Sequence, residues 1–228
     1  MNLQHVAIDL DGTLLDSVGD LHAAVVSMQS TLNLSYSSLN EVQSWIGNGI
    51  DNLVQRALSH SRFQHDGEID QAQALHVFKE AYRNTNGQFA SVYPGVIEGL
   101  EWLSQLGIPL SVVTNKSREF TVPLLEKTKL QHYFSHTVCG DDVLHKKPAP
   151  DALLVCAGRA NSDPSHSLMI GDSINDFIAA RRAGFRLLAV SYGYNHGVSP
   201  SDLDEKDRPE LLVDSLAELP SIKDSILY

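Results

Sequence analysis

The sequence predicts an α/β protein, a doubly wound parallel sheet of Rossmann-like type, with a small helical cap domain inserted after the first strand. From about residue 90 onward, short apolar runs alternate with amphipathic segments, which is the pattern of strands joined by crossover helices. The N-terminal run "HVAIDL" adds a strand, whereas residues 16 to 88 contain helix-like segments but no convincing strand. We therefore expect a catalytic core of residues 1–15 and 89–228 and a helical cap of residues 16–88.

The apolar runs fit the strands of a buried parallel sheet because each is short and bounded by turn residues or an amphipathic segment. They are Val6 to Leu10, Pro109 to Thr114, His136 to Gly140, Ser167 to Asp172 and Phe185 to Ser191. The helices between them are expected near Val96 to Leu106, Arg118 to Lys129, Pro150 to Ala160 and Ile174 to Ala183. Ligands of such sheets bind at the carboxyl ends of the strands.

The inserted segment has helical periodicity throughout. Its helices are expected near Val18 to Leu32, Leu39 to Trp45, Ile50 to Ser59 and Glu68 to Thr85. Ser38 and Glu41 have the spacing of a capping box at the start of the second helix. Near the C-terminus, "SPSDLDEKDRPE" is typical of a polar loop.

Composition limits the class of partner. The 228 residues are 43% hydrophobic and carry a formal charge of −11, which disfavours a nucleic acid or an anionic membrane and leaves a small-molecule substrate. Cys139 and Cys156 form no CxxC pattern and lie in apolar runs, so we expect buried free thiols in a reducing compartment. With no leader and no apolar run of about 18 residues, we expect a soluble cytoplasmic protein, monomer or homodimer.

Polar residues follow the apolar runs at the points where strands should end. They are Asp9 and Asp11, Thr114 and Asn115, Lys146 and Lys147 in a proline-containing loop, and Asp172 and Asp176. Because the strands are parallel, we expect these side chains at one edge of the sheet.

The acidic residues in this set favour a magnesium site. Asp9 and Asp11 are two residues apart, so in extended backbone both point to one side and repel unless a proton or cation lies between them. With Asp172 and Asp176 they form an all-oxygen cluster, which suits Mg²⁺. The tight turn at Gly12 and Thr13 offers backbone N–H groups to an anion. A metal and an anion held together is the requirement of phosphoryl transfer.

Each feature also has a purely structural interpretation. "DG" is a common turn, Ser173 and Asp176 have capping-box spacing, Thr114 could end its strand, and "KKP" could be a solvated loop. The joint occurrence of these features at strand ends favours a site. His132 and His136 are four apart, but they fall between a helix and a strand with no third ligand, so zinc is disfavoured.

Four motifs in this order resemble the haloacid dehalogenase-like hydrolases: "DLDGT" (9–13), "VVTN" (112–115), "KKPAP" (146–150) and "GDSINDF" (171–177). In that family the first aspartate attacks phosphorus and the second is the general acid and then base. The resemblance therefore implies that Asp9 is the nucleophile and Asp11 the acid/base.

The resemblance also assigns the remaining strand-end residues. It implies that Thr114 and Lys147 hold the phosphoryl group, with Asn115 beside them. It implies that Mg²⁺ is bound by Asp9, the backbone carbonyl of Asp11 and Asp172, with Asp176 supporting the metal site.

A narrower likeness concerns the bacterial phosphoglycolate phosphatases within this family. "SWIGNGI" (44–50), "VYPGV" (92–96), "GDDV" (140–143) and "SYGYNHG" (191–197) look like segments of those enzymes, although His196 stands where an aromatic residue is expected. This implies hydrolysis of 2-phosphoglycolate, with a cap that closes over the site.

The cap turn "GNG" has a physical interpretation as a carboxylate site. Gly47 and Gly49, on either side of Asn48, permit close backbone approach, and the N–H groups that open the next helix can receive an anion. Arg56 is a further candidate for that carboxylate. The alternatives are glycines that merely separate two helices and an arginine in solvent.

Other functions stay open at this point. They are a phosphatase of other small esters, a phosphomutase of the β-phosphoglucomutase type, a dehalogenase, and a receiver-type signalling module that carries phosphate on an aspartate. The dehalogenase would have no need of Asp11, Asp172 or a metal. The helical insert and the second acid Asp11 disfavour the signalling module.

Overall fold

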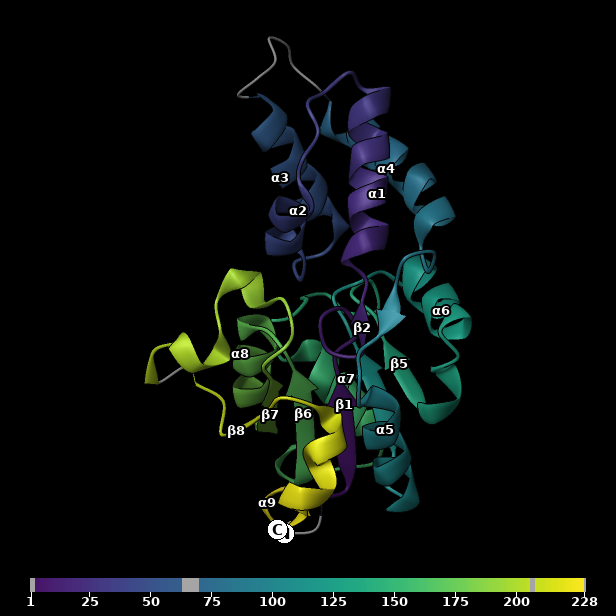
Figure 1. The fold of residues 1–228 in the computed structure, drawn as a ribbon. Coiled ribbons are helices and arrows are strands. Elements are labelled where there is room, and N and C mark those ends of the chain that lie inside the picture. Colours follow the sequence, from purple (N-terminus) through teal and green to yellow (C-terminus); the bar gives the residue numbers. More distant parts are fainter. Residues whose placement is uncertain (1–2, 63–69, 206–207, 228) are drawn as a thin grey trace.

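The computed structural model describes residues 3–62, 70–205 and 208–227. Its main sheet has the order β5-β4-β1-β6-β7-β8, and every neighbouring pair is parallel (Figure 1). The strands are β1 (His5–Ile8), β4 (Leu110–Val113), β5 (His136–Val138), β6 (Ser167–Gly171), β7 (Arg186–Val190) and β8 (Leu211–Val213). The α/β class and the parallel sheet predicted from the apolar runs are confirmed; the three-residue edge strand β8 was not predicted.

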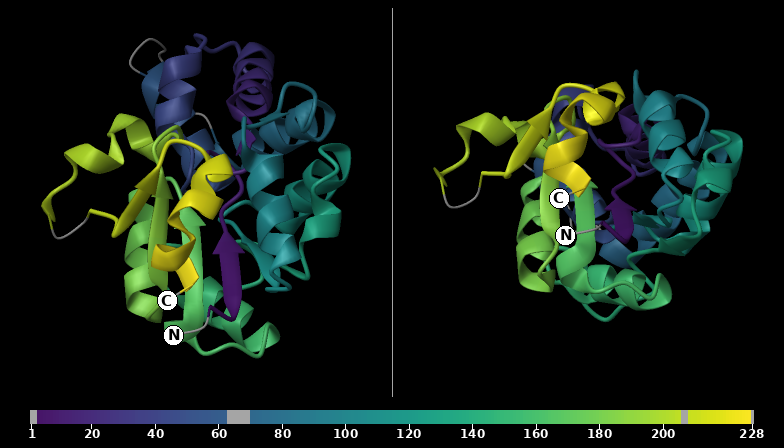
Figure 2. Two further views of the ribbon diagram at one scale, coloured as in Figure 1. Left: turned by 60° about the horizontal axis from the view of Figure 1, so that its bottom comes forward. Right: turned by 90° about the horizontal axis from the view of Figure 1, so that it is seen from below.

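Helices cover both faces of this sheet, as a doubly wound fold requires. They are α5 (Val96–Gln105), α6 (Arg118–Lys127), α7 (Asp151–Arg159), α8 (Ile174–Ala183) and α9 (Lys223–Leu227), with 3-10 turns at Gln131–Tyr133, Pro164–His166, Asn195–Gly197, Pro200–Asp202 and Leu216–Ile222. Side chains of β1 alternate between two cores: Val6 and Ile8 pack with α5 and α6, and Ala7 packs with α7 and α8. The C-terminal segment, yellow in Figure 2, packs in the same core as α5.

A helical layer of α1 (Val18–Thr31), α2 (Leu39–Trp45), α3 (Ile50–Arg62) and α4 (Gln71–Thr85) lies beyond one end of the strands (Figure 1). All four helices contribute to a second apolar cluster, which Phe120 of α6 and Tyr194 from the loop after β7 complete. The capping box of Ser38 and Glu41 is present. Helix α4 begins at Gln71, after the N-cap Asp70, and the predicted start at Glu68 lies outside the described residues.

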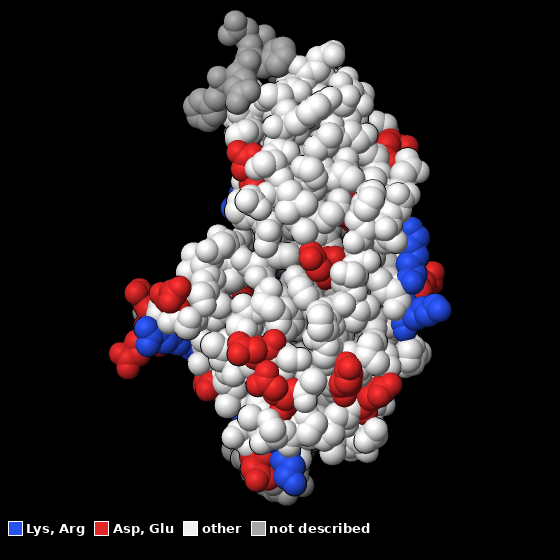
Figure 3. Space-filling model, viewed as in Figure 1, with Lys and Arg blue, Asp and Glu red and all other residues white. Residues whose placement is uncertain are grey.

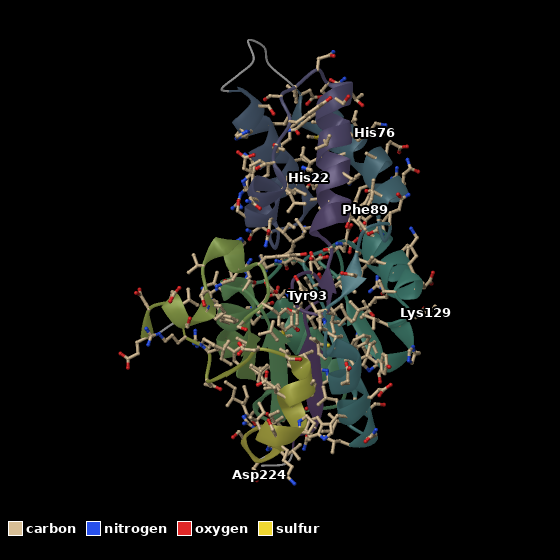
Figure 4. The ribbon with its side chains drawn as sticks, viewed as in Figure 1. His22, His76, Phe89, Tyr93, Lys129 and Asp224 are labelled. Carbon is tan, nitrogen blue, oxygen red and sulfur yellow. The ribbon has the colours of Figure 1, made fainter. Side chains whose placement is uncertain are left out.

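Two passages of chain connect the layer to the sheet. Strand β2 (Leu15–Asp16) leads into α1, strand β3 (Ser91–Val92) returns from α4, and the two pair antiparallel. Sequence periodicity does not detect such a ribbon because each strand has only two residues. Figure 4 labels Phe89 and Tyr93 on the returning passage, where the backbone N–H of Tyr93 donates to the carbonyl of Leu14 at 3.2 Å.

Asp20 ties the two passages together. Its side chain is buried in α1, and its carboxylate accepts hydrogen bonds from four successive backbone N–H groups, those of Gly87, Gln88, Phe89 and Ala90. A buried carboxylate that receives four donors is satisfied without a counter-ion. The residue thus fixes the point where the chain leaves α4 against the start of α1.

Replacing Asp20 by asparagine is expected to lower the free energy of unfolding by about 1–3 kcal/mol, because the amide group brings two buried donors to a place where only acceptors fit. Urea denaturation measures the change. Asp51→Asn is the matched control, since Asp51 is exposed in the first turn of α3, and its cost should stay below about 1 kcal/mol. Equal effects of the two substitutions would contradict the role of Asp20.

Cys139 and Cys156 are free, buried thiols, as expected. Burial raises the pKa of each to about 11, which makes both poorly reactive. Among the described residues, no helix combines the length and apolar character needed to cross a membrane.

Candidate active site

The polar residues at the ends of β1, β4 and β6 line one pocket that faces the helical layer. These three strands are neighbours in the sheet, so their carboxyl ends bring distant segments together. The pocket encloses about 490 Å³, part of it open to solvent. Its core wall is Asp9, Asp11, Thr114, Asn115, Lys116, Lys147, Ser173 and Asn175, and its opposite wall is Leu21, Ile46, Gly47, Gly49, Ile50 and Leu53.

Asp9, Asp172 and Asp176 form a buried acidic cluster. Each offers a carboxylate oxygen, and these oxygens lie within 4.8 Å of one another. Glycines make room for the cluster: a Cβ on Gly12 would lie 2.5 Å from Oδ2 of Asp172, and one on Gly193 would lie 2.1 Å from its Cβ. The backbone at Gly12 has φ of 90°, which also favours glycine.

One lysine serves two of these acids. The Nζ of Lys147 lies 2.8 Å from Oδ1 of Asp9 and 2.6 Å from Oδ1 of Asp176, and it donates to the carbonyl of Val113 at 2.9 Å. Three carboxylates around a single ammonium leave an excess of negative charge, which a divalent cation would neutralise.

Burial and mutual repulsion both raise pKa values in the cluster. Burial, followed by the charge of Asp176, raises the pKa of Asp9 well above its usual range, although Lys147 opposes the shift. Burial and Asp176 also raise the pKa of Asp172 to about 6. The hydrogen bonds that Asp172 accepts from the backbone N–H groups of Asn195 and Tyr194 and from the hydroxyl of Thr13 act in the opposite direction.

Asp176 also has the structural role that its spacing suggested. Its Oδ2 accepts from the backbone N–H and the hydroxyl of Ser173 at 3.1 and 2.9 Å, at the start of α8. Its Oδ1 remains directed at Lys147. The capping and the acidic-cluster interpretations are therefore compatible.

Asp11 contacts a different lysine. Its carboxylate lies 2.7 and 2.8 Å from the Nζ of Lys116 and accepts a hydrogen bond from the hydroxyl of Ser17. Strand β1 ends at Ile8, before both acids, and Asp9 and Asp11 both line the pocket. Each carboxylate has its own ammonium partner, Lys147 for Asp9 and Lys116 for Asp11.

Neither Lys116 nor Ser17 was a candidate from the sequence. The ammonium of Lys116 is buried against Asp11, 105 residues away in the chain. The only available signal was its position directly after "TN" at a strand end, which does not distinguish a buried lysine from an exposed one.

The residues expected to hold the phosphoryl group gather around the same pocket. Thr114 lines it, and its hydroxyl accepts from the backbone N–H of Lys116 at 3.2 Å. The amide of Asn115 donates to the carbonyls of Gly47 and Lys147 at 2.8 and 2.9 Å. Asn115 thus joins the loop that contains Gly47 to the loop that contains Lys147. Thr13 instead donates to Asp172 at 2.9 Å.

The "GNG" turn of the helical layer reaches the core wall. The side chain of Asn175 donates to the carbonyl of Gly47 at 3.3 Å and to Oδ1 of Asn48 at 3.1 Å. Gly47 and Gly49 have φ of 108° and 83°, so both positions favour glycine. Arg56 lies apart from these residues: it is exposed on α3, and its guanidinium donates to the carbonyl of Ser44 at 3.4 Å.

His132 lies in the 3-10 turn Gln131–Tyr133 and His136 begins β5, so the two side chains do not share a helix face. Among residues 3–62, 70–205 and 208–227, the only potential metal-binding group of at least three His, Cys, Asp or Glu residues is the acidic cluster.

The class of protein is defined by three features: a doubly wound parallel sheet, an acidic cluster that includes the aspartate after its first strand, and a helical insert over the pocket. Residues 6–190 match the model of the haloacid dehalogenase-like hydrolase family, and the chain belongs to that family.

Named relatives are similar over nearly the whole chain. "Phosphoglycolate phosphatase 1" of Pseudomonas aeruginosa is 43% identical, with 94% of this chain and 77% of that protein covered. A phosphoglycolate phosphatase of Nitrosococcus oceani is 39% identical, with 95% of each chain covered. The crystal structure of a predicted phosphoglycolate phosphatase from Haemophilus somnus has a TM-score of 0.89 at 32% identity, covering 98% of this chain and 99% of that one.

Proposed function

We propose that this protein is a Mg²⁺-dependent phosphatase that hydrolyses 2-phosphoglycolate to glycolate and phosphate through a phosphoryl-Asp9 intermediate. The observation that carries the proposal is the buried Asp9 carboxylate at the end of β1, which is paired with Lys147 and placed in the acidic cluster that opens into the pocket. We further propose that residues 16–88 act as a cap on the core, residues 1–15 and 89–228. A cytoplasmic location and a monomeric or homodimeric state stay predictions.

The acidic cluster fits the proposed cation. Hard carboxylate oxygens are the ligands that Mg²⁺ prefers. Burial, followed by the charge of Asp176, raises the pKa values of Asp9 and Asp172. Asp9, Asp172 and the backbone carbonyl of Asp11 would hold the ion, with Asp176 beside them. When bound, Mg²⁺ supplies neutralisation of the phosphate charge.

The chain's own residues supply the remaining chemistry. The Asp9 carboxylate forms a bond to phosphorus as the bond from phosphorus to the glycolate oxygen breaks, and the protonated form of Asp11 gives that oxygen its proton. Asp11 then takes a proton from the water that attacks phosphorus and releases phosphate from Asp9. The ammonium of Lys147 and the hydroxyl of Thr114 neutralise the transferring group, aided by the N–H groups at Gly12 and Thr13.

The opposite wall of the pocket supports a small substrate. Its side chains Leu21, Ile46, Ile50 and Leu53 are aliphatic, so they offer no partners to the hydroxyl groups of a sugar phosphate. The backbone N–H groups that open α3, next to Gly49, can receive the carboxylate of glycolate. The names of the relatives at 43% and 39% identity agree with this substrate. A role for Arg56 stays a prediction.

A panel of phosphate esters tests the assignment. We expect the specificity constant for 2-phosphoglycolate to exceed those for sugar phosphates by at least about a hundredfold in Mg²⁺, and activity to vanish in EDTA. A flat ranking would contradict phosphoglycolate and leave the phosphatase intact. Isomerised sugar phosphate would indicate a mutase, and activity on a haloacid in EDTA would indicate a dehalogenase. A phosphoryl-protein that persists for minutes would indicate a signalling module.

Binding of Mg²⁺ is expected to weaken as the pH falls through about 6, the raised pKa of Asp172. Between the ordinary value of 3.8 and about 6, the folded protein binds a proton that the unfolded chain does not. Stability of the metal-free protein therefore falls as the pH rises through that window, and protons compete with the metal there. Mg²⁺ should raise the Tm more at about pH 7.5 than at about pH 5, and Asp172→Asn should reduce the difference. Equal shifts at both pH values would argue against the cluster as the metal site.

A further inference from the structure

Tyr194 links the start of the helical layer to the core. Its side chain comes from the loop after β7 and is buried. The hydroxyl accepts hydrogen bonds from the backbone N–H groups of Ser17 and Val18 at 2.7 and 3.0 Å, and it donates to Oδ1 of Asp16 at 2.8 Å. Ser17 is the N-cap of α1 and makes no capping bond with its own side chain. A residue 177 positions away thus supplies the acceptor that a helix N-terminus needs.

The other end of Tyr194 contacts the acidic cluster. Its backbone N–H donates to Oδ2 of Asp172 at 2.8 Å, and the next N–H, of Asn195, donates to the same oxygen at 3.2 Å. The loop is held in an uncommon conformation, because Asn195 and His196 have φ of 33° and 52°. The side chain of Asn195 fixes it through hydrogen bonds with the N–H of Ile174 and the carbonyl of Val198.

The structure has the helical layer engaged with the core while these bonds are made. The "GNG" turn accepts from Asn115 and Asn175 at Gly47, and the pocket has walls from both parts. Ser17 directly follows the β2–β3 ribbon, where the chain crosses between the two parts. Ser17 and Val18 belong to α1 and its N-cap, whereas the backbone of Tyr194 belongs to the loop after β7, so a movement of α1 away from that loop would break these hydrogen bonds.

We propose that Tyr194 is a positioning residue that holds α1 in the closed arrangement and couples that arrangement to Asp172. Tyr194 is not among the residues that line the pocket. It acts through the first turn of α1, whose position determines whether Leu21 covers the pocket. The kinetic part of this inference rests on the proposed phosphatase function, whereas the structural part does not.

Hydrogen exchange at the amides of Ser17 and Val18, measured without substrate, tests the structural part. Tyr194→Phe keeps the ring and removes the hydroxyl, so exchange at these two amides should accelerate roughly tenfold to a hundredfold. The matched control is Tyr36→Phe, because Tyr36 belongs to the same helical layer but is exposed. That control should leave exchange at Ser17 and Val18 within about twofold of the wild type.

The coupling to Asp172 needs a second variant. Asp172→Ala removes the acceptor of the Tyr194 backbone N–H, so exchange at Ser17 and Val18 should accelerate by at least about threefold although Asp172 touches neither residue. Protection that is unchanged in Tyr194→Phe overturns the proposal as a whole. Protection lost in Tyr194→Phe but unchanged in Asp172→Ala overturns the coupling.

Kinetics separate positioning from general destabilisation. In Tyr194→Phe the KM for 2-phosphoglycolate should rise about tenfold while kcat changes less than about threefold, because the closed state contributes to substrate capture. A lower kcat at unchanged KM would overturn the positioning role. If the wild type does not hydrolyse 2-phosphoglycolate, the proposed function fails, and the exchange result still decides the structural inference.

Discussion

Replacement of Asp9 by asparagine is expected to lower kcat for 2-phosphoglycolate by at least about 10⁴-fold. The amide has nearly the shape of the carboxylate and retains an oxygen for Lys147, which lies 2.8 Å from Oδ1 of Asp9. It lacks the negative charge and the nucleophilic oxygen needed to attack phosphorus. Release of inorganic phosphate, measured in excess Mg²⁺, gives the rate.

The control for this substitution is Asp224→Asn. Asp224 is exposed near the C-terminus, at the end of the molecule opposite the helical layer (Figure 4), and its loss should change kcat by less than about twofold. An Asp9→Asn protein that is folded by circular dichroism and retains more than about one per cent of the wild-type kcat would exclude the proposed nucleophile.

Replacement of Lys147 by methionine has the second largest expected effect, since it affects both activity and stability. Methionine keeps the length of the side chain but leaves the buried Asp9 and Asp176 without their shared ammonium. We expect a fall of about 3 kcal/mol in the free energy of unfolding near neutral pH, and a loss of about 10³-fold in kcat/KM.

The pH dependence of this variant follows from the same contacts. Without Lys147 the pKa of Asp9 rises further, because the opposing ammonium is gone. Protonation then relieves the repulsion, so part of the lost stability should return as the pH is lowered from about 7 to about 5.

Lys146→Met is the matched control, because Lys146 is the exposed neighbour in the same loop, and its stability should stay within about 1 kcal/mol of the wild type. Equal destabilisation by the two substitutions would contradict the role of Lys147.

Two lysine side chains, Lys116 and Lys147, are buried, although the chain as a whole is acidic. The chain carries a net charge of −11, and the face in Figure 3 shows more acidic than basic side chains. Lys116 and Lys147 are both buried at the pocket. An anionic substrate therefore meets two ammonium groups at the pocket, despite the net negative charge of the chain.

The strands of the core were predictable because each is a compact apolar run, and a parallel sheet places the residues after those runs at one edge. Asp9, Thr114 and Asp172 therefore meet in one pocket or its acidic cluster. The ribbon of β2 and β3 and the edge strand β8 were not predictable, since two or three residues carry no periodic signal.

The supporting residues of the site were not predictable for a different reason. Lys116 pairs with Asp11, 105 residues away in the chain. The hydroxyl of Tyr194 accepts from the backbone N–H of Ser17, 177 residues away. Neither pairing follows from local sequence, because both depend on how the strands and the helical layer pack. Asp20 was not predictable either, because no sequence pattern shows that its carboxylate accepts hydrogen bonds from the four backbone N–H groups of residues 87–90.

Detection of the phosphoryl-enzyme tests the proposed mechanism most directly. The protein is mixed with 2-phosphoglycolate labelled at phosphorus in the presence of Mg²⁺, quenched in acid within milliseconds, and digested for peptide mapping. The label is expected on the peptide that contains Asp9, at a level that rises before free phosphate and is absent from Asp9→Asn. Steady release of phosphate with no label on the protein, or with the label on another residue, would contradict catalysis through Asp9.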